Sequence, residues 1–235
     1  MLSVSNLVGG YGAADEIVKG VSFNAVRGEV LTIIGPNGAG KSTALKLVAG
    51  LLVTKSGSVT LDGNALTTLD PQSRARHGMV FVPQEHNVFG ALSVAENLSM
   101  GGYLDPRQEK ERSEDIFARF PALKERRRNA AASLSGGQRQ TLAMAIAMMA
   151  SPRVLLLDEP TAALSPVAAA EIFKVVRSVA DEGIAVLMVE QNALAALAMS
   201  DKACVLVDGR VVLEGKADEL GRDPEVRQAF LGGRG

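Results

Sequence analysis

A glycine-rich segment at residues 35–43, GPNGAGKST, carries the residue types that bind phosphate. Its glycines let successive backbone N–H groups converge on phosphate oxygens, and Lys41 can reach the terminal phosphates of a nucleotide. The hydroxyl of Ser42 can serve as a ligand of Mg²⁺. The predicted phosphate-binding loop comprises Gly35, Pro36, Asn37, Gly38, Ala39, Gly40, Lys41, Ser42 and Thr43. The alternative is an ordinary glycine-rich turn, which would not explain the lysine or the apolar strand before it.

Two adjacent carboxylates follow the apolar segment VLLL at residues 154–157. Asp158 ends the predicted strand and can hold Mg²⁺, while Glu159 can orient and activate a water molecule against the γ-phosphate. Gln84 ends another apolar segment, GMVFVPQ, and its side-chain amide can reach the metal or the water. The predicted metal ligands are therefore Ser42, Gln84 and Asp158. A solvated acidic turn is the alternative for the carboxylates, and the phosphate loop in the same chain argues against it.

A second pair of glycines lies in LSGGQRQ at residues 134–140. This segment also looks like a phosphate cradle, yet it has no lysine and no carboxylate of its own nearby. The chain therefore holds one phosphate-binding loop with all its parts and one segment that cannot complete a site.

The apolar pattern of the chain predicts the strands that position these residues. EVLTII is continuously apolar, which is typical of a strand covered on both faces, and it leads into Gly35 and then a helix from Lys41 to about Gly50. The segments GMVFVPQ, RVLLLDEP and IAVLMVE have the same character. The first sixty residues alternate instead, which predicts half-buried strands, followed by a turn at Asp62-Gly63. ACVLVDGRVVLEG predicts a hairpin that turns at Asp208-Gly209.

Residues 93–150 carry helical periodicity and almost no strand signal. This predicts a parallel α/β core of about 1–91 and 151–235, interrupted by an all-helical insert of about 92–150. With 47% hydrophobic residues, the chain can bury such a core as a single domain over residues 1–235.

The composition limits the classes of partner. The net charge is −1, so no global field draws the chain to nucleic acid or to an anionic membrane. The single cysteine, Cys204, lies in the apolar run ACVLV and is expected to be a buried, reduced thiol. The N-terminus does not have the pattern of a signal peptide, and no apolar stretch approaches the length of a membrane span. The composition predicts a soluble chain.

LSGGQ, with the phosphate loop upstream and LLLDEP downstream, resembles the ABC ATPase family, and the resemblance extends over nearly the whole chain. It implies a P-loop NTPase (RecA-like) α/β core with an N-terminal antiparallel β subdomain and an inserted all-helical subdomain. It also implies that LSGGQ starts a helix and binds the γ-phosphate of ATP held by a second subunit. The residues that would bind ATP in trans are Ser135, Gly136, Gly137 and Gln138. The incomplete cradle then implies a dimer.

The same resemblance assigns roles to single residues. Tyr11 matches the aromatic residue that stacks on adenine, and Gln84 matches the loop residue that senses a membrane partner. The catalytic residues would be Glu159, Gln84 and Gln191. Two positions depart from the wider family. Gln191 stands where a histidine is usual, and Ser165 follows DEPTAAL where an aspartate is usual.

These departures narrow the resemblance. VEQNA, the SP at residues 165–166, LSVAENLSMGGY and the ending VRQAFLGG together resemble the LivF-type ATPase subunits of branched-chain amino acid importers. ATPases of urea and amide importers share much of this pattern. The resemblance implies ATP and Mg²⁺ as cofactors and a peripheral location at the cytoplasmic face of the cell membrane. The implied partners are a second ATPase subunit, in a homodimer or a LivG-type heterodimer, transmembrane permease subunits and, indirectly, a solute-binding protein.

A soluble ABC protein that acts on DNA or the ribosome is a second class of function. Translation-associated members usually carry two cassettes, whereas this chain has one GKS loop. DNA-repair members have a long coiled coil between their halves, which the short distance from Gln84 to Leu134 does not accommodate. A P-loop kinase would have no use for LSGGQ, and an inactive scaffold would not need Glu159. No nucleic-acid partner is expected.

Overall fold

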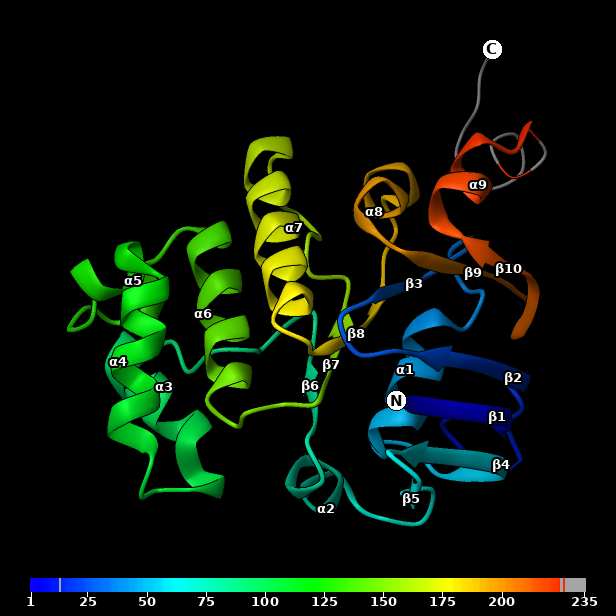
Figure 1. Cartoon of the computed structure of the whole chain (residues 1–235), viewed down its shortest axis with the longest axis horizontal. Coiled ribbons are helices and arrows are strands. Elements are labelled where there is room, and N and C mark those ends of the chain that lie inside the picture. Colours follow the sequence, from blue (N-terminus) through cyan, green and yellow to red (C-terminus); the bar gives the residue numbers. More distant parts are fainter. Residues whose placement is uncertain (13, 225, 227–235) are drawn as a thin grey trace.

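The structure is a computed structural model that describes residues 1–12, 14–224 and 226. Its strands form two sheets with helices packed around them (Figure 1). The larger sheet has the strand order β10-β9-β3-β8-β7-β6. Its strands are β3 (Val30–Ile34), β6 (Met79–Val82), β7 (Val154–Asp158), β8 (Ala185–Val189), β9 (Lys202–Val207) and β10 (Arg210–Lys216). The pairings are parallel from β6 to β9, and β10 pairs antiparallel with β9.

The central strands of this sheet are buried on both faces, which is why their sequences are continuously apolar. All five residues of β3, β7 and β8 are buried. Leu31 of β3 lies in the same buried cluster as Leu45 of α1 on one face, and its neighbour Val30 lies in the same cluster as Val176 of α7 on the other. The helices are α1 (Lys41–Ala49) on the first face, and α6 (Gly136–Met148), α7 (Pro166–Asp181) and α8 (Ala193–Met199) on the second.

The second sheet is antiparallel, as the alternating pattern predicts. Its order is β2-β1-β4-β5. Its strands are β1 (Leu2–Gly9), β2 (Val18–Ala25), β4 (Thr54–Leu61) and β5 (Asn64–Ala65). Val4 pairs with Phe23 and with Val59, and all three side chains are buried in the cluster that also contains α1 residues. β4 and β5 join at the predicted Asp62-Gly63 turn, and α2 (Pro71–Arg76) follows.

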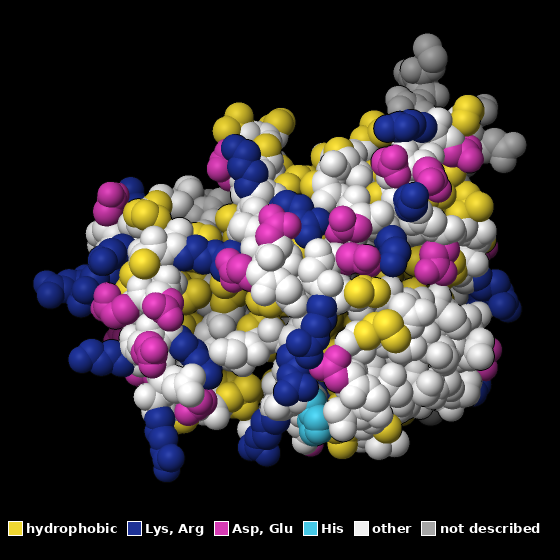
Figure 2. Space-filling view, in the orientation of Figure 1, with side chains coloured by type: hydrophobic (Ala, Val, Ile, Leu, Met, Phe, Trp, Pro, Cys, Tyr) yellow, Lys and Arg dark blue, Asp and Glu magenta, His cyan; other side chains and the backbone are white. Residues whose placement is uncertain are grey.

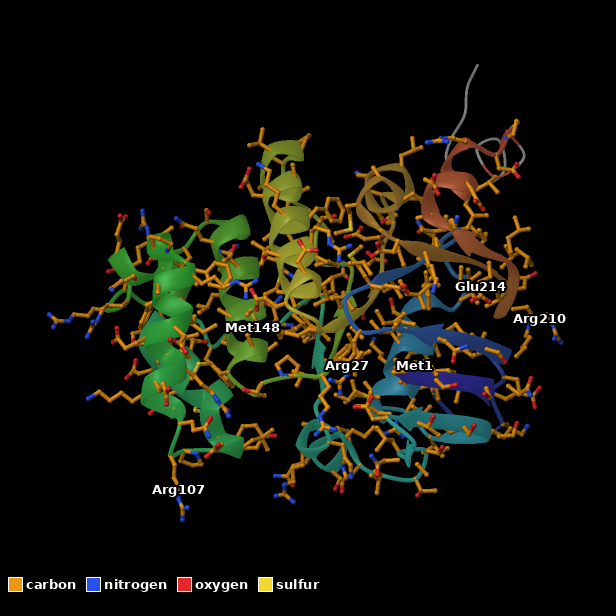
Figure 3. The ribbon with its side chains drawn as sticks, in the orientation of Figure 1. Met1, Arg27, Arg107, Met148, Arg210 and Glu214 are labelled. Atoms are coloured by element: carbon orange, nitrogen blue, oxygen red, sulfur yellow. The ribbon has the colours of Figure 1, made fainter. Side chains whose placement is uncertain are left out.

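The turn after β4 is fixed to the rest of the molecule by charge. The Asp62 carboxylate accepts hydrogen bonds from the amino group of Met1 and from the Arg27 guanidinium, the latter at 2.6 Å. Figure 3 shows Met1 and Arg27 close together at this point. A third cation, Arg153, lies just before β7, and its Nη1 is 3.4 Å from the Oδ2 of Asp62. The Met1 amino group and Arg27 hold the pKa of Asp62 at about 2.

Residues 92–150 form a group of helices at one end of the molecule (Figure 1). The helices that precede α6 are α3 (Val94–Gly101), α4 (Glu109–Arg119) and α5 (Pro121–Glu125), with short 3₁₀ turns at Gly102–Leu104 and Ala131–Ser133. They share a hydrophobic cluster that includes Leu98, Phe117 and Leu142. The predicted helical character of this range is confirmed, while the division of the chain at residues 91 and 150 stays a prediction.

The C-terminal part of the described chain contains the β9–β10 hairpin, which turns at Asp208-Gly209 as predicted. Cys204 in β9 is fully buried, and burial raises the pKa of its thiol to about 12. Helix α9 (Ala217–Arg222) follows. Apart from Val226, the motif VRQAFLGG lies outside the described residues. Among the described helices, none combines the length and the apolar character that a membrane span requires.

Candidate active site

The loop at residues 35–43 joins β3 to α1. Gly35 has a φ of 153°, and a Cβ at this position would lie 2.1 Å from the carbonyl oxygen of Leu206 in β9. Gly40, with a φ of 96°, is the N-cap of α1 and offers no side chain to the first-turn N–H groups. Because these N–H groups have no intrahelical acceptor, they are available to a phosphate. The loop is therefore packed tightly on β9, while the N–H groups of the first turn of α1 stay open.

The side chain of Lys41 lies within this loop. It is 5% exposed, and its Nζ donates to the carbonyl oxygens of Gly35 at 2.9 Å and Pro36 at 3.2 Å. Burial lowers the pKa of the ammonium, and three nearby carboxylates act in the opposite direction. They belong to Glu159, Glu190 and Asp158. The structure thus brings the predicted lysine and the predicted carboxylate pair into one electrostatic site.

Asp158 ends β7 and is 4% exposed. Its Oδ1 is buried and has no hydrogen-bond partner within the described part of the chain. A buried carboxylate oxygen without a partner is costly, and a bound cation would relieve that cost. Mg²⁺ prefers oxygen ligands and is usually held by one or two carboxylates together with nucleotide phosphates. The predicted donors, Ser42, Gln84 and Asp158, all offer oxygen and therefore fit Mg²⁺.

Gln84 lies two residues beyond β6. β6 runs parallel to β7 with Val82 opposite Leu157, so both strands end at the same edge of the sheet. The Gln84 side chain is exposed, and no hydrogen bond of the described residues joins it to Asp158. The described residues also hold no cluster of three or more His, Cys, Asp or Glu side chains placed to bind a metal.

Glu159 and Gln191 line the same cavity, whose volume is about 440 Å³. Glu159 has a φ of 46°, a conformation that non-glycine residues rarely adopt, and its N–H donates to the carbonyl oxygen of Val189 in β8 at 3.0 Å. Gln191 lies two residues beyond β8, and its side chain is exposed. The structure therefore brings the predicted general base and the predicted sensor to one cavity from two neighbouring strands.

Tyr11 lies beside α1. The residue is 62% exposed, and the Nζ of Lys46 in α1 is 6.0 Å from its ring centroid. The Tyr11 ring therefore lies next to the helix that begins in the phosphate loop. Stacking of Tyr11 on adenine stays a prediction.

The LSGGQ segment starts α6, in agreement with the family resemblance. Ser135 is the N-cap: its Oγ accepts a hydrogen bond from the N–H of Gln138 at 3.3 Å, and the Gln138 side chain accepts one from the N–H of Ser135 at 3.0 Å. This capping box leaves the N–H groups of Gly136 and Gly137 without intrahelical acceptors. No hydrogen bond of the described residues joins this segment to the loop at 35–43. The two glycine-rich segments lie on two separate helix N-termini (Figure 1).

Glu190 is a residue of the site that no sequence pattern singled out. It is 2% exposed, and its carboxylate accepts hydrogen bonds from Thr161 and from the N–H of Gln191. The feature of the sequence that could have identified Glu190 is its position: it ends the apolar run IAVLMV directly before Gln191.

Comparisons with known proteins agree with this geometry. The chain matches the ABC transporter family over residues 18–162. It is 39% identical over 234 residues to the high-affinity branched-chain amino acid transport ATP-binding protein BraG of Pseudomonas aeruginosa, with 99% of this chain and 100% of that protein covered. It is 41% identical over 222 residues to the probable branched-chain amino acid transport ATP-binding protein LivF of Archaeoglobus fulgidus, with 94% of each chain covered.

Solved structures share the fold. An ATP-binding cassette of an ABC transporter in its ADP conformation has a TM-score of 0.87 and 28% identity, with 99% of both chains covered. A dimeric ATP-binding cassette in a post-hydrolysis state, bound to ADP and Pi, has a TM-score of 0.80 and 26% identity, with 92% of this chain and 99% of that chain covered. These similarities confirm the predicted fold class. The chain belongs to the ABC transporter family and is an ATPase.

Proposed function

We propose that this chain is the ATP-hydrolysing subunit of an importer and that the importer carries branched-chain amino acids. The observation that carries the proposal is the meeting of Lys41 with Asp158 and Glu159, where β3 and β7 end. The solute class rests on the names of the two relatives, BraG and LivF, which align over almost the entire chain.

In the proposed mechanism, the phosphate loop binds ATP through its backbone N–H groups. Lys41 exchanges its two carbonyl acceptors for oxygens of the terminal phosphates. Ser42, Asp158 and Gln84 would hold Mg²⁺, which neutralises charge that develops on the phosphate oxygens. Tyr11 packs against the adenine ring, as aromatic side chains commonly do with planar partners.

Glu159 acts as the general base. Its carboxylate takes a proton from a water molecule as the water oxygen bonds to the γ-phosphorus, and the bond from that phosphorus to the β–γ bridging oxygen breaks. The amide of Gln191 donates a hydrogen bond to a γ-phosphate oxygen. Because this amide is neutral, its hydrogen bond should be about half as strong as that from a charged imidazole.

The proposed active unit has two chains. The N–H groups of Gly136 and Gly137 and the Ser135 hydroxyl would contact the γ-phosphate bound by another subunit, because the α6 N-terminus has no lysine of its own. The second chain is another copy or a LivG-type subunit. The dimeric ATP-binding cassette of the same fold supports this arrangement.

The permease is proposed to dock in a groove of about 760 Å³ between the helical part and the core. Its lining comes mainly from α2, β6, α3 and α6 and includes four exposed large side chains, Leu51, Phe89, Met100 and Tyr103. Figure 2 shows hydrophobic side chains in the hollow between these parts of the molecule. The segment that joins β6 to Phe89, both of which line the groove, contains Gln84, which would link permease movement to the nucleotide. Docking there places the chain at the cytoplasmic face of the membrane, with a solute-binding protein on the far side.

Copurification tests the proposal. The chain is isolated in mild detergent from its own cells, and its partners are identified by mass spectrometry. We expect permease subunits, a second ATPase subunit when the dimer is mixed, and ATP-dependent uptake of leucine or valine by the reconstituted complex. Association with ribosomes or DNA in place of a permease would contradict it. A complex that hydrolyses ATP with a different solute would retain the ATPase role and reject the branched-chain assignment.

A further inference from the structure

The Glu190 side chain joins two segments that carry candidate catalytic residues. Glu190 directly follows β8 and is 2% exposed. One carboxylate oxygen, Oε1, accepts hydrogen bonds from the N–H of Thr161 at 3.0 Å and from its Oγ1 at 2.7 Å. The other oxygen, Oε2, accepts one from the N–H of Gln191 at 3.1 Å. Since Thr161 lies two residues after Glu159, one carboxylate connects the turn of Glu159 to the turn of Gln191.

The backbone around Glu190 is also fixed to the neighbouring strands. Its N–H donates to the carbonyl oxygen of Ile33 at 3.3 Å, in the strand that leads into the phosphate loop. The preceding residue, Val189, accepts the N–H of Glu159 at 3.0 Å. Glu190 therefore lies beside the ends of β3, β7 and β8 that lead into the site.

The groups that bond to the Glu190 carboxylate all act as donors. A carboxylate can accept from all of them, whereas a carboxamide of the same size has one acceptor oxygen and one NH₂ group. Burial raises the pKa of Glu190, and the hydrogen bonds from Thr161 oppose that rise. Because the side chain is buried and both its oxygens are engaged, it is not placed to activate a water molecule as Glu159 would.

We propose that Glu190 is a positioning residue for ATP hydrolysis, which holds Glu159 and Gln191 at a fixed separation across the cavity that both line. The inference rests on the catalytic roles proposed above for these two residues. A displacement of about 1 Å at a reacting group can lower a rate by up to about a hundredfold. ATP itself is held by the loop at 35–43, and Glu190 bears on Lys41 of this loop as one of three nearby carboxylates. A loosened Glu190 contact should therefore slow the chemical step, while loss of its charge near Lys41 should change ATP affinity only slightly.

The test is Glu190→Gln in the full chain, with kcat, KM, the Kd for ATP and the unfolding temperature measured on the same preparation. The substituted amide must turn its NH₂ group toward Thr161 or toward the N–H of Gln191, so one of the two turns loses its acceptor. We expect kcat to fall about tenfold while KM and Kd change by less than about threefold. Glu171→Gln, an exposed carboxylate of α7 paired with Lys174, is the matched control and should leave all four quantities unchanged.

Variants of Thr161 examine the same contact from its other side. Thr161→Val removes the hydroxyl donor but keeps the N–H donor, so kcat should fall by less than in Glu190→Gln. Thr161→Ser restores the hydroxyl and should bring kcat back to within about twofold of the wild type. In a Gln191→Ala background, Glu190→Gln should have a smaller effect than in the wild type, because residues that act through one another are not additive.

The outcomes separate the inference from the proposed function. A wild-type kcat in Glu190→Gln would overturn the positioning role. A fall in kcat that is accompanied by clear losses of ATP affinity and of thermal stability would also overturn it. If Glu190→Gln does not fold, Thr161→Val decides: a lower kcat at unchanged Kd supports the inference, and a wild-type kcat rejects it. Turnover retained in Glu159→Gln would reject the proposed catalytic roles and the inference with them. An inactive Glu159→Gln beside a fully active Glu190→Gln would reject the inference alone.

Discussion

The N-termini of α1 and α6 both offer backbone N–H groups to an anion, but only the N-terminus of α1 also has a lysine. Gly40 is the N-cap of α1, α6 begins with Gly136 and Gly137, and both helices present backbone N–H groups that have no intrahelical acceptor. At α1 the N-cap Gly40 makes no side-chain hydrogen bond, and Lys41 adds a buried charge beside three carboxylates. At α6 the N-cap Ser135 and Gln138 satisfy each other, and no lysine is present.

The two helix ends therefore differ in how strongly each can bind an anion by itself. A helix N-terminus contributes about 0.3–1 kcal/mol to an exposed anion. A charge-assisted hydrogen bond from a lysine contributes about 1.5–3 kcal/mol. We therefore propose that the α1 end holds a nucleotide within one chain, whereas the α6 end strengthens a site that the loop of another chain has begun.

The largest effect is expected from Glu159→Gln. Loss of the general base should lower turnover by more than about a hundredfold, while the α1 end keeps its phosphate contacts and ATP still binds. Phosphate release and ATP affinity, measured side by side, check this expectation. Substantial turnover in the variant would show that another group activates the water.

The next largest effects distinguish the contact to the phosphates from the contact to the adenine ring. Lys41→Ala should weaken ATP binding by about 1.5–3 kcal/mol, because a charge-assisted contact in a partly desolvated loop is lost. Tyr11→Ala should cost about 0.5–1.5 kcal/mol, since only an exposed aromatic contact is removed. Titration with a fluorescent ATP analogue measures both. Equal losses would mean that the phosphate loop does not dominate nucleotide binding.

A smaller effect is expected from Gln191→Ala. Because the neutral amide donates a weak hydrogen bond, its removal should lower the ATPase rate of the assembled transporter by less than tenfold, a rise of under about 1.4 kcal/mol in barrier height. Steady-state rates of the two purified complexes provide the measurement. A loss as complete as that of Glu159→Gln, with ATP binding intact, would reject this ranking.

The smallest effect belongs to a region remote from both helix ends. The Met1 amino group and Arg27 depress the pKa of Asp62 to about 2, so their stabilising contribution is present above about pH 3.8 and is lost as the pH falls toward 2. Solvent screening limits this surface contribution to about 1 kcal/mol. Asp62→Asn should lower the free energy of unfolding by that amount at pH 7, by less below pH 4, and should leave ATP affinity unchanged. Urea unfolding across this pH range tests it, and a pH-independent loss would contradict the assigned cause.

Local sequence patterns were sufficient to predict the elements whose pattern is compatible with only one kind of structure. The continuous apolar runs gave β3, β7 and β8 because both faces of a central parallel strand are covered. GPNGAGKST was located correctly before a helix from its local pattern, whereas the family resemblance supplied the helix start at LSGGQ. The extent of β4 did not follow from the local pattern, because pairing with Gly9 of β1 extends the strand back to Thr54 through polar residues.

Buried polar residues were not predictable from the pattern, because their partners are distant in sequence. Arg74 reads as a residue on the surface of a short helix, yet it is 2% exposed and donates to the carbonyl oxygens of Leu47 at 3.0 Å and Thr67 at 2.7 Å. It thereby satisfies the C-terminal end of α1, the helix that begins at the phosphate loop. Glu190 is the second case, since its role depends on Thr161, 29 residues away in the sequence.

The most direct test of the central claim, that the α6 end completes a site in another chain, is the mass of the Glu159→Gln variant by light scattering. With Mg-ATP, and with its second ATPase subunit if the dimer is mixed, we expect twice the mass of one chain. Without nucleotide we expect the mass of a single chain. Adding Ser135→Arg should abolish the ATP-dependent dimer while ATP still binds to each chain. A variant that stays strictly monomeric at high concentration, with Mg-ATP and partner present, would contradict the account.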